Sequence, residues 1–153
     1  MVGELPAIAL KAIGIVRNEV KQQPPAQRDW WAEVISEVVV APSLTEALDG
    51  LEEFSHIIVL YWMHRAASGG IPLKVHPRGR KELPLVGLFA ARTPNRPNRI
   101  GKATVRLLQR QGNILRVKGL DALDGTPVID VKPYIPGYDS ADDARVPQWM
   151  NSR

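Results

Sequence analysis

Hydrophobic and polar residues alternate with a period of two along much of this 153-residue chain. A period of two sends successive side chains to opposite faces of an extended strand, so it indicates strands with a buried face. The stretch 55–64 is also rich in β-branched and aromatic residues, as buried strands are. The pattern predicts strands over residues 9–16, 31–40, 55–64, 83–91, 102–108, 113–120 and 128–131.

Helical spacing is confined to one short segment. Ser43 is a candidate N-cap, Glu46 is its capping-box partner, and Gly50 ends the pattern. Six or seven strands with one short helix predict a mainly-β fold, a single closed or nearly closed β-barrel domain. A Rossmann fold is not expected, because no G-x-G-x-x-G follows a strand and β-α-β alternation is missing. We expect the barrel over residues 1–140 and an irregular tail over residues 141–153.

A proline-rich basic segment follows the predicted strand 83–91. Pro94 and Pro97 fix the backbone and remove donors, so the segment is a stiff loop. Arg92, Arg96 and Arg99 project from it, and ordered guanidinium groups suit an anionic ligand. The alternative is a solvated basic turn.

Charge is distributed unevenly along the chain. Residues 1–64 hold 4 basic and 9 acidic side chains, residues 65–118 hold 13 and 1, and residues 119–153 hold 3 and 6. A central basic block of this kind predicts a surface that binds polyanions, and nucleic acid is the leading candidate. This central block contains candidate phosphate contacts outside the expected ligand pocket, namely Lys74, Arg78, Arg80 and Lys81. The alternative is that folding scatters these charges over several faces.

A second dense segment covers residues 119–134. Asp121 and Asp124 flank a turn, and the segment then becomes extended. Asp130, Lys132 and Tyr134 are spaced two residues apart, so they share one face of a strand. They predict either a polar pocket wall with Asp130 as a general base, or an edge strand whose polar face meets water.

Other chemistries find little support in the sequence. The chain has no cysteine, which excludes disulfides and thiol nucleophiles and agrees with a reducing cytosol. His56 and His64 lack a third ligand at suitable spacing, so we expect no metal site. The apolar run 57–63 is too short to cross a bilayer, so we expect no membrane partner.

Trp30 and Trp31 are adjacent in a predicted strand, so they would point to opposite faces. At most one would enter the core. The other would stack on a base or ligand ring, or pack at a subunit interface.

Several segments together resemble one known family. They are Ile13-Gly14-Ile15-Val16-Arg17-Asn18, residues 50–56, His64, the run from Gly87 to Gly101, and the run from Leu123 to Pro136. They occur in the order typical of the TrmO/TsaA-like family, and the similar region covers roughly residues 9–140. The two long motifs are specific.

The resemblance implies a β-barrel, S-adenosylmethionine-dependent methyltransferase outside the Rossmann class. It implies a cytoplasmic homodimer that methylates N6 of threonylcarbamoyladenosine beside the tRNA anticodon. Two alternatives are the same chemistry on a small-molecule acceptor, and a non-catalytic RNA-binding β-barrel.

By similarity, the cofactor S-adenosylmethionine would be bound by residues from several segments, partly through their backbone groups. These residues are Gln27, Arg28, Asp29, His64, Arg65, Arg92, Lys102, Leu120, Asp121, Ala122, Leu123 and Asp124. Arg99 stands where the family commonly has proline, and Lys102 replaces a usual apolar residue. Both changes add positive charge near the expected pocket.

Methyl transfer from a sulfonium requires in-line positioning of the acceptor nitrogen. A carbamoyl-linked nitrogen is a poor nucleophile, so a base should help remove its proton, and Asp130 and Tyr134 are the candidates. Arg96, Arg99 and Lys132 are the candidate substrate-binding residues.

Overall fold

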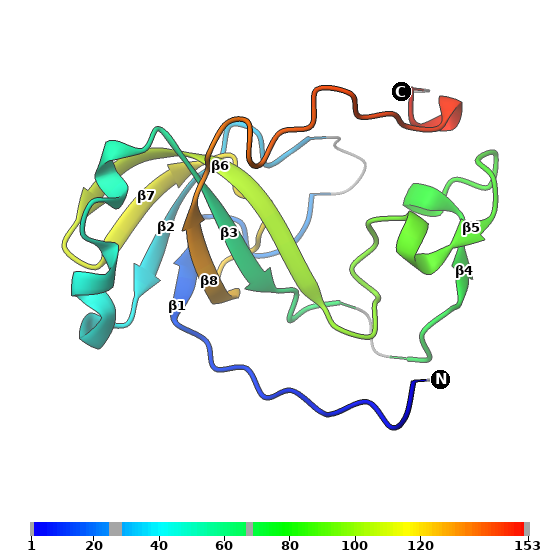
Figure 1. The fold of residues 1–153 in the computed structure, drawn as a ribbon, viewed down its shortest axis with the longest axis horizontal. Helices are drawn as coiled ribbons and strands as arrows, with labels where there is room; N and C mark the ends of the chain where they lie inside the picture. Colours follow the sequence, from blue (N-terminus) through cyan, green and yellow to red (C-terminus); the bar gives the residue numbers. More distant parts are fainter. Residues whose placement is uncertain (1, 25–28, 67–68, 152–153) are drawn as a thin grey trace.

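The computed structural model describes residues 2–24, 29–66 and 69–151. Its centre is a closed antiparallel barrel with the strand order β1-β2-β7-β6-β3-β8, and β8 pairs back to β1 (Figure 1). The predicted mainly-β, non-Rossmann barrel is confirmed. The barrel strands are β1 (Gly14–Arg17), β2 (Ile35–Val40), β3 (His56–Trp62), β6 (Ile100–Gln111), β7 (Ile114–Lys118) and β8 (Pro127–Pro133).

The core is formed by alternate residues of every barrel strand. In β3, Ile57 and Val59 are fully buried, and they pack with residues such as Val38 and Leu115 from the opposite wall. Burial of each such side chain stabilises the fold by roughly 1.5–3 kcal/mol. Closure leaves the barrel without a free sheet edge, which protects it from pairing with other chains.

Two glycines allow close packing in the barrel wall. A Cβ atom on Gly14 would lie 2.5 Å from the carbonyl oxygen of Val39 on the neighbouring strand. A Cβ atom on Gly101 would lie 2.3 Å from the ring of Tyr61, which is therefore packed directly on the β6 backbone. Both glycines belong to the motifs that carry the family resemblance.

Beyond the end of β3, residues 71–90 form a small separate unit, here called the lobe (Figure 1). It contains β4 (Lys74–Val75), the 3-10 turn η3 (Pro77–Gly79), β5 (Val86–Gly87) and the 3-10 turn η4 (Leu88–Ala90). The two short strands pair with each other and not with the barrel. Pro77, Leu83 and Leu88 are buried.

Several predicted elements differ from those observed. The first strand begins at Gly14 instead of residue 9, and the second begins at Ile35 instead of residue 31. The stretch 83–91 is strand only at Val86–Gly87. The predicted helix is a 3-10 helix, η1 (Pro42–Leu48), and Ser43 does not cap it, because Ala41 precedes the first turn and Pro42 opens it. The remaining 3-10 turns are η2 (Leu51–Glu53) and η5 (Gln148–Asn151).

Candidate functional site

A cavity of about 750 Å³ lies at the end of the barrel where β3 ends and β8 begins. Five parts of the chain line it: residues 23–31 where described, the end of β3 with the turn after it, the lobe, the proline-rich loop, and the turn before β8. The lining residues are Gln23, Pro24, Asp29, Trp30, Trp31, Tyr61, Met63, His64, Arg65, Ala66, Arg78, Arg80, Arg92, Pro94, Asp121, Ala122, Leu123 and Thr126.

The two long sequence motifs therefore meet at one cavity. Arg92 and Pro94 come from the proline-rich loop, and Asp121 to Leu123 come from the aspartate-flanked turn. The first loop leads into β6 and the second into β8, and both of these strands pair with β3. The convergence follows from this strand order.

Tyr61 connects the barrel core to the cavity wall. Its ring is buried against Gly101, and its hydroxyl donates a hydrogen bond of 2.6 Å to the carbonyl oxygen of Asp121. Burial raises the pKa of Tyr61, and the Asp121 carboxylate adds to this effect. The phenol therefore stays protonated and fixes the turn at Asp121.

Titratable groups on the cavity wall have altered pKa values. Reduced solvation raises the pKa of Asp121, Arg92 opposes this, and Asp29 raises it further. Reduced solvation also lowers the pKa of His64, and Arg65 contributes in the same direction. His64 is therefore a neutral imidazole at pH 7.

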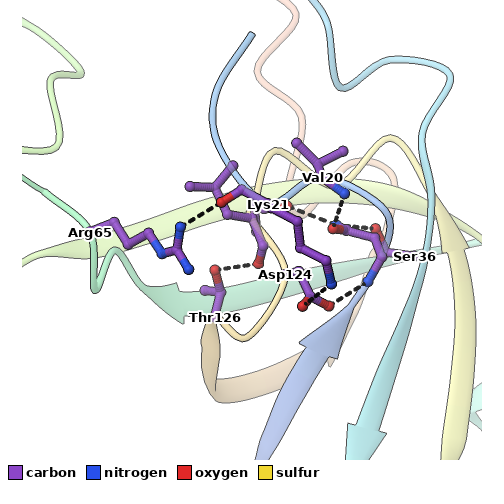
Figure 2. A network of polar contacts seen from close by, with 9 residues as sticks. Val20, Lys21, Ser36, Arg65, Asp124 and Thr126 are labelled. Atoms are coloured by element: carbon purple, nitrogen blue, oxygen red, sulfur yellow. Dashed lines mark hydrogen bonds and ion pairs between the residues drawn. The ribbon is translucent and has the colours of Figure 1, made fainter.

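A hydrogen-bond network holds the turn before β8 in place (Figure 2). The Asn18 side chain donates to the Ala122 carbonyl at 2.9 Å and to Ser36 Oγ at 3.0 Å. The Asp124 carboxylate accepts the Asn18 N–H at 2.9 Å and the Lys21 ammonium at 2.6 Å. Figure 2 also shows Arg65 reaching the Lys21 carbonyl, at 2.5 Å. The segment after β1 and the turn thus form one hydrogen-bonded unit.

The three arginines of the proline-rich loop have different environments. Arg92 lines the cavity near Asp121. Arg96 donates to the carbonyls of Ala91 and Thr93, at 2.8 and 3.3 Å, and lies 5.7 Å from the Phe89 ring centroid. Arg99 donates to the Ala66 carbonyl at 3.2 Å, tying this loop to the turn after β3. Two of the guanidinium groups therefore brace the loop around the third.

The comparisons with known proteins agree with this geometry. The model of the tRNA-methyltransferase O N-terminal domain family matches residues 17–140. This chain belongs to the TrmO family. A solved TrmO structure from Pseudomonas aeruginosa superposes with a TM-score of 0.76 at 32% identity, over 95% of this chain and 63% of that chain. The resemblance stated from the sequence is confirmed.

Curated relatives come from several organisms. A Methanothermobacter thermautotrophicus protein described as a probable S-adenosyl-L-methionine-binding protein is 47% identical over 87% of this chain and 94% of its own length. A mouse protein named tRNA (adenine(37)-N6)-methyltransferase is 41% identical over 65% of this chain and 23% of its own length. The chain spans less than two thirds of the solved TrmO chain and about a quarter of the mouse protein.

Most of the residues that the TrmO resemblance assigns to the cofactor line the cavity. They are Asp29, His64, Arg65, Arg92, Asp121, Ala122 and Leu123. Leu120 is fully buried in the core behind the turn. Lys102 is exposed on β6. Asp124 lines a different, polar groove and holds the turn, as described above. Gln27 and Arg28 lie outside the described residues.

The candidate bases do not line the cavity of their own chain. Asp130 is on β8 opposite Leu60, and its carboxylate pairs with the Lys132 ammonium at 2.8 Å. Tyr134 lies beside His56, with the ring centroids 6.4 Å apart. His56 begins β3, whereas the cavity is at the other end of this strand, roughly 20 Å along it.

Several cavity residues differ from the expectation. The sequence predicts that at most one of Trp30 and Trp31 enters the core and that the other meets a ligand ring or a subunit interface, whereas both line the cavity and lie in a turn instead of a strand. Arg78 and Arg80 also line it, although the sequence placed them outside the pocket. Tyr61 and Met63 also line it, near the end of β3, and nothing in their spacing along the sequence indicates a ligand.

The described part of the chain shows no group of three His, Cys, Asp or Glu side chains that could hold a metal ion. It also shows no helix with the length and hydropathy needed to cross a bilayer. The cavity wall instead combines carboxylates, guanidinium groups, tryptophans and a methionine. Such a wall suits a ligand that carries a ring and charges of both signs.

Proposed function

We propose that this protein is an S-adenosylmethionine-dependent tRNA methyltransferase that acts on N6 of adenine, with threonylcarbamoyladenosine next to the anticodon as the acceptor. The observation that carries the proposal is the shared cavity of the proline-rich loop and the aspartate-flanked turn. Family membership and the printed names of the relatives support it. A tRNA substrate would place the protein in the cytoplasm.

The cavity wall offers a group for each part of the cofactor. Carboxylates of Asp29 and Asp121 would attract the cationic ammonium and sulfonium groups, and Arg92 would bind the cofactor's carboxylate. The tryptophans or Met63 would contact the adenine ring. The cofactor supplies an electrophilic methyl group, and the chain supplies orientation and a site that limits access of water.

We further propose that the protein works as a homodimer. Residues 2–12 are extended and exposed, and they carry four large apolar side chains, of which Leu5 and Ile8 are 74% and 80% exposed. An ordered apolar segment of this kind suits an interface with a second copy. Sedimentation equilibrium would give the assembly state, and a monomer at all concentrations would contradict this part of the proposal.

A homodimer is also what would allow Asp130 or Tyr134 to act as the base, since neither reaches the cavity of its own chain. The test mixes Arg92→Ala and Asp130→Asn variants under conditions of subunit exchange. Recovery of activity in the mixture would support a base from the partner subunit. Full activity of Asp130→Asn and Tyr134→Phe by themselves would remove both residues as bases.

The central experiment transfers labelled methyl from S-adenosylmethionine into bulk tRNA from cells that lack the enzyme. We expect label in the N6-methylated threonylcarbamoyl nucleoside after digestion. Arg92→Ala should lower cofactor affinity at least tenfold, because it removes a charge-assisted hydrogen bond worth about 1.5–3 kcal/mol. Calorimetric titration measures this affinity. Arg106→Ala is the matched control, since Arg106 is exposed on β6 and does not line the cavity.

The outcomes separate the alternatives. No binding of S-adenosylmethionine by the wild-type protein would contradict the methyltransferase proposal and leave an RNA-binding barrel. Binding of the cofactor without label in tRNA would point to a small-molecule acceptor.

A further inference from the structure

Arg78 has a backbone conformation that is unusual for its residue type. It lies at the centre of η3 with φ 58° and ψ 19°, in the left-handed region. Residues other than glycine rarely adopt this region, and such positions are concentrated at functional sites. Gly79, its neighbour, has φ 66° and meets no such restriction.

The surrounding lobe holds this conformation in place. The Gly79 N–H donates to the His76 carbonyl at 3.0 Å, and the Arg80 N–H donates to the Pro77 carbonyl at 3.1 Å. His76 Nδ1 lies 2.8 Å from the Leu83 carbonyl oxygen, which ties the turn to the rest of the lobe. With Pro77 buried, the direction in which the Arg78 side chain leaves the backbone is fixed.

The Arg78 guanidinium lines the cavity but is not used to hold the fold. Among residues 2–24, 29–66 and 69–151 it makes no hydrogen bond or ion pair. Its neighbour Arg80 pairs with Glu82 at 2.6 Å, and Arg96 and Arg99 donate to backbone carbonyls. Arg78 is therefore an available cation on the lobe side of the cavity, held there by a strained turn.

The rest of the cavity already has groups for the cofactor. Asp29, Asp121 and Arg92 provide two anions and a cation from the barrel side. Arg78 comes from the lobe, which is a separate unit paired only with itself. A second ligand that approaches from the lobe side would meet this guanidinium together with a wall that contains tryptophans.

We propose that Arg78 binds an anionic oxygen group of the methyl acceptor, and that the lobe is the acceptor-recognition element of the site. The shared chemistry is a carboxylate or phosphate that accepts two hydrogen bonds from one guanidinium. Its source is either the carboxylate of the base substituent or an adjacent nucleotide phosphate. The inference rests on the proposed function, since it concerns the acceptor of that reaction.

The test variant is Arg78→Gly. Glycine adopts the left-handed conformation without strain, so the variant removes the guanidinium while the turn is retained. We expect a melting temperature no lower than that of the wild type. Arg145→Gly is the matched control, because it makes the same change at an exposed, irregular position of the tail.

The readout is equilibrium binding of small probes with S-adenosylhomocysteine present. The first pair is N6-threonylcarbamoyladenosine and its neutral methyl ester, and the second is adenosine 5′-monophosphate and adenosine. We expect the full-length wild type to prefer the charged member of one pair by about 10–100-fold. Arg78→Gly should lose that preference, whereas Arg145→Gly should keep it.

Each outcome decides the proposal. A preference within the first pair identifies the carboxylate, and one within the second pair identifies the phosphate. A wild type without either preference, or an Arg78→Gly variant that keeps it, overturns the proposal. The measurement needs no turnover, so failure of methyl transfer to tRNA is scored separately and would count against the proposed function alone.

Discussion

Arg92, Arg96 and Arg99 are the same amino acid within one short loop, yet their surroundings give them different roles. Arg96 and Arg99 donate to backbone carbonyls of the loop and of the turn after β3, so they hold the loop in place. Arg92 is left to face the cavity. A substitution at Arg96 or Arg99 would therefore act on ligand binding through loop geometry, whereas one at Arg92 would act directly.

Asp124 is expected to contribute to stability in a pH-dependent way. Its hydrogen bonds with the Lys21 ammonium and the Asn18 N–H lower its pKa below the ordinary value of 3.8. A lowered pKa in the folded state means that the contribution is complete above that value and is lost as the pH falls through the folded-state pKa. Asp124→Asn should therefore lower the free energy of unfolding by about 1–2 kcal/mol at pH 7.

Denaturant unfolding at several pH values checks this expectation. The difference between Asp124→Asn and the wild type should shrink between pH 5 and pH 2. Asp142→Asn, the same change at an exposed position in the tail, should have no such effect. A difference that stays constant over this range would show that the carboxylate's charge is not what holds the turn.

At the scale of elements, β3 is the strand on which the site depends. It pairs with β6 and β8, and the loops that precede these two strands form opposite walls of the cavity. Tyr61 packs on Gly101 of β6 and hydrogen-bonds to Asp121 before β8. The relative position of the two walls is therefore set by the register of three strands.

Gly101→Ala should disturb both the barrel and the cavity. Its Cβ atom would lie 2.3 Å from the Tyr61 ring, so the ring must shift. We expect the free energy of unfolding to fall by about 1–3 kcal/mol, as in other overpacked cores, and cofactor affinity to weaken as the tyrosine hydroxyl leaves the Asp121 carbonyl. Thermal unfolding and calorimetric titration measure the two effects.

Gly87→Ala is the matched control for this variant, because no heavy atom lies within 4 Å of a Cβ built there. It should leave both measurements unchanged. Equal stability of Gly101→Ala and the wild type would mean that Tyr61 can move without loss, and that its contact with β6 does not position the turn.

The alternation of apolar residues was enough to predict most strands and the barrel class, because every barrel strand has one face in the core. It failed over residues 83–91, where only Val86–Gly87 is strand, because apolar residues there are divided between buried positions such as Leu83 and Leu88 and exposed ones such as Leu85 and Phe89. It also failed for Trp30 and Trp31, which lie in a turn where alternation has no meaning.

The site, like the fold, was predicted from the sequence only in part. The motif residues Arg92 and Asp121 to Leu123 line one cavity, as their sequence segments suggested, and their contact with a cofactor stays a prediction. Arg78 and Arg80 were expected outside the pocket, because nothing in the sequence shows that the lobe lies at the end of β3. The role of Arg96 in substrate binding stays a prediction, and its bonds to backbone carbonyls could not be predicted, because they depend on a loop path that two prolines do not by themselves define.

At the scale of the whole molecule, ion pairs reduce the positive charge of the central block more on the barrel than at the cavity, where Arg80 pairs with Glu82. Arg110 pairs with Asp49 and Glu52, and Lys118 pairs with Glu33. Among the described residues, no ion pair involves Arg78 or Arg92, both at the cavity. The net positive field is therefore expected to be strongest around the cavity opening.

Binding of tRNA should consequently depend strongly on salt. If about four phosphates are contacted, affinity should fall roughly 100-fold between 50 and 200 mM monovalent salt. Filter binding or fluorescence anisotropy at several salt concentrations gives the slope. Calorimetric titration with S-adenosylmethionine is the comparison and should change much less. A flat profile for tRNA would contradict an electrostatic contribution from this face.

The lobe is inserted between β3 and β6, and all of β3 pairs with the first part of β6, from Ile100 to Arg106, while the lobe strands pair only with each other. Segment 71–90 is thus a natural unit for exchange between homologues. A chimaera that carries the segment of a homologue on an unaltered barrel would keep the cofactor site of the barrel. It would recognise a different methyl acceptor through the new segment. Such grafts could be used to direct methyl transfer to a new acceptor, and natural homologues could diverge in the same way.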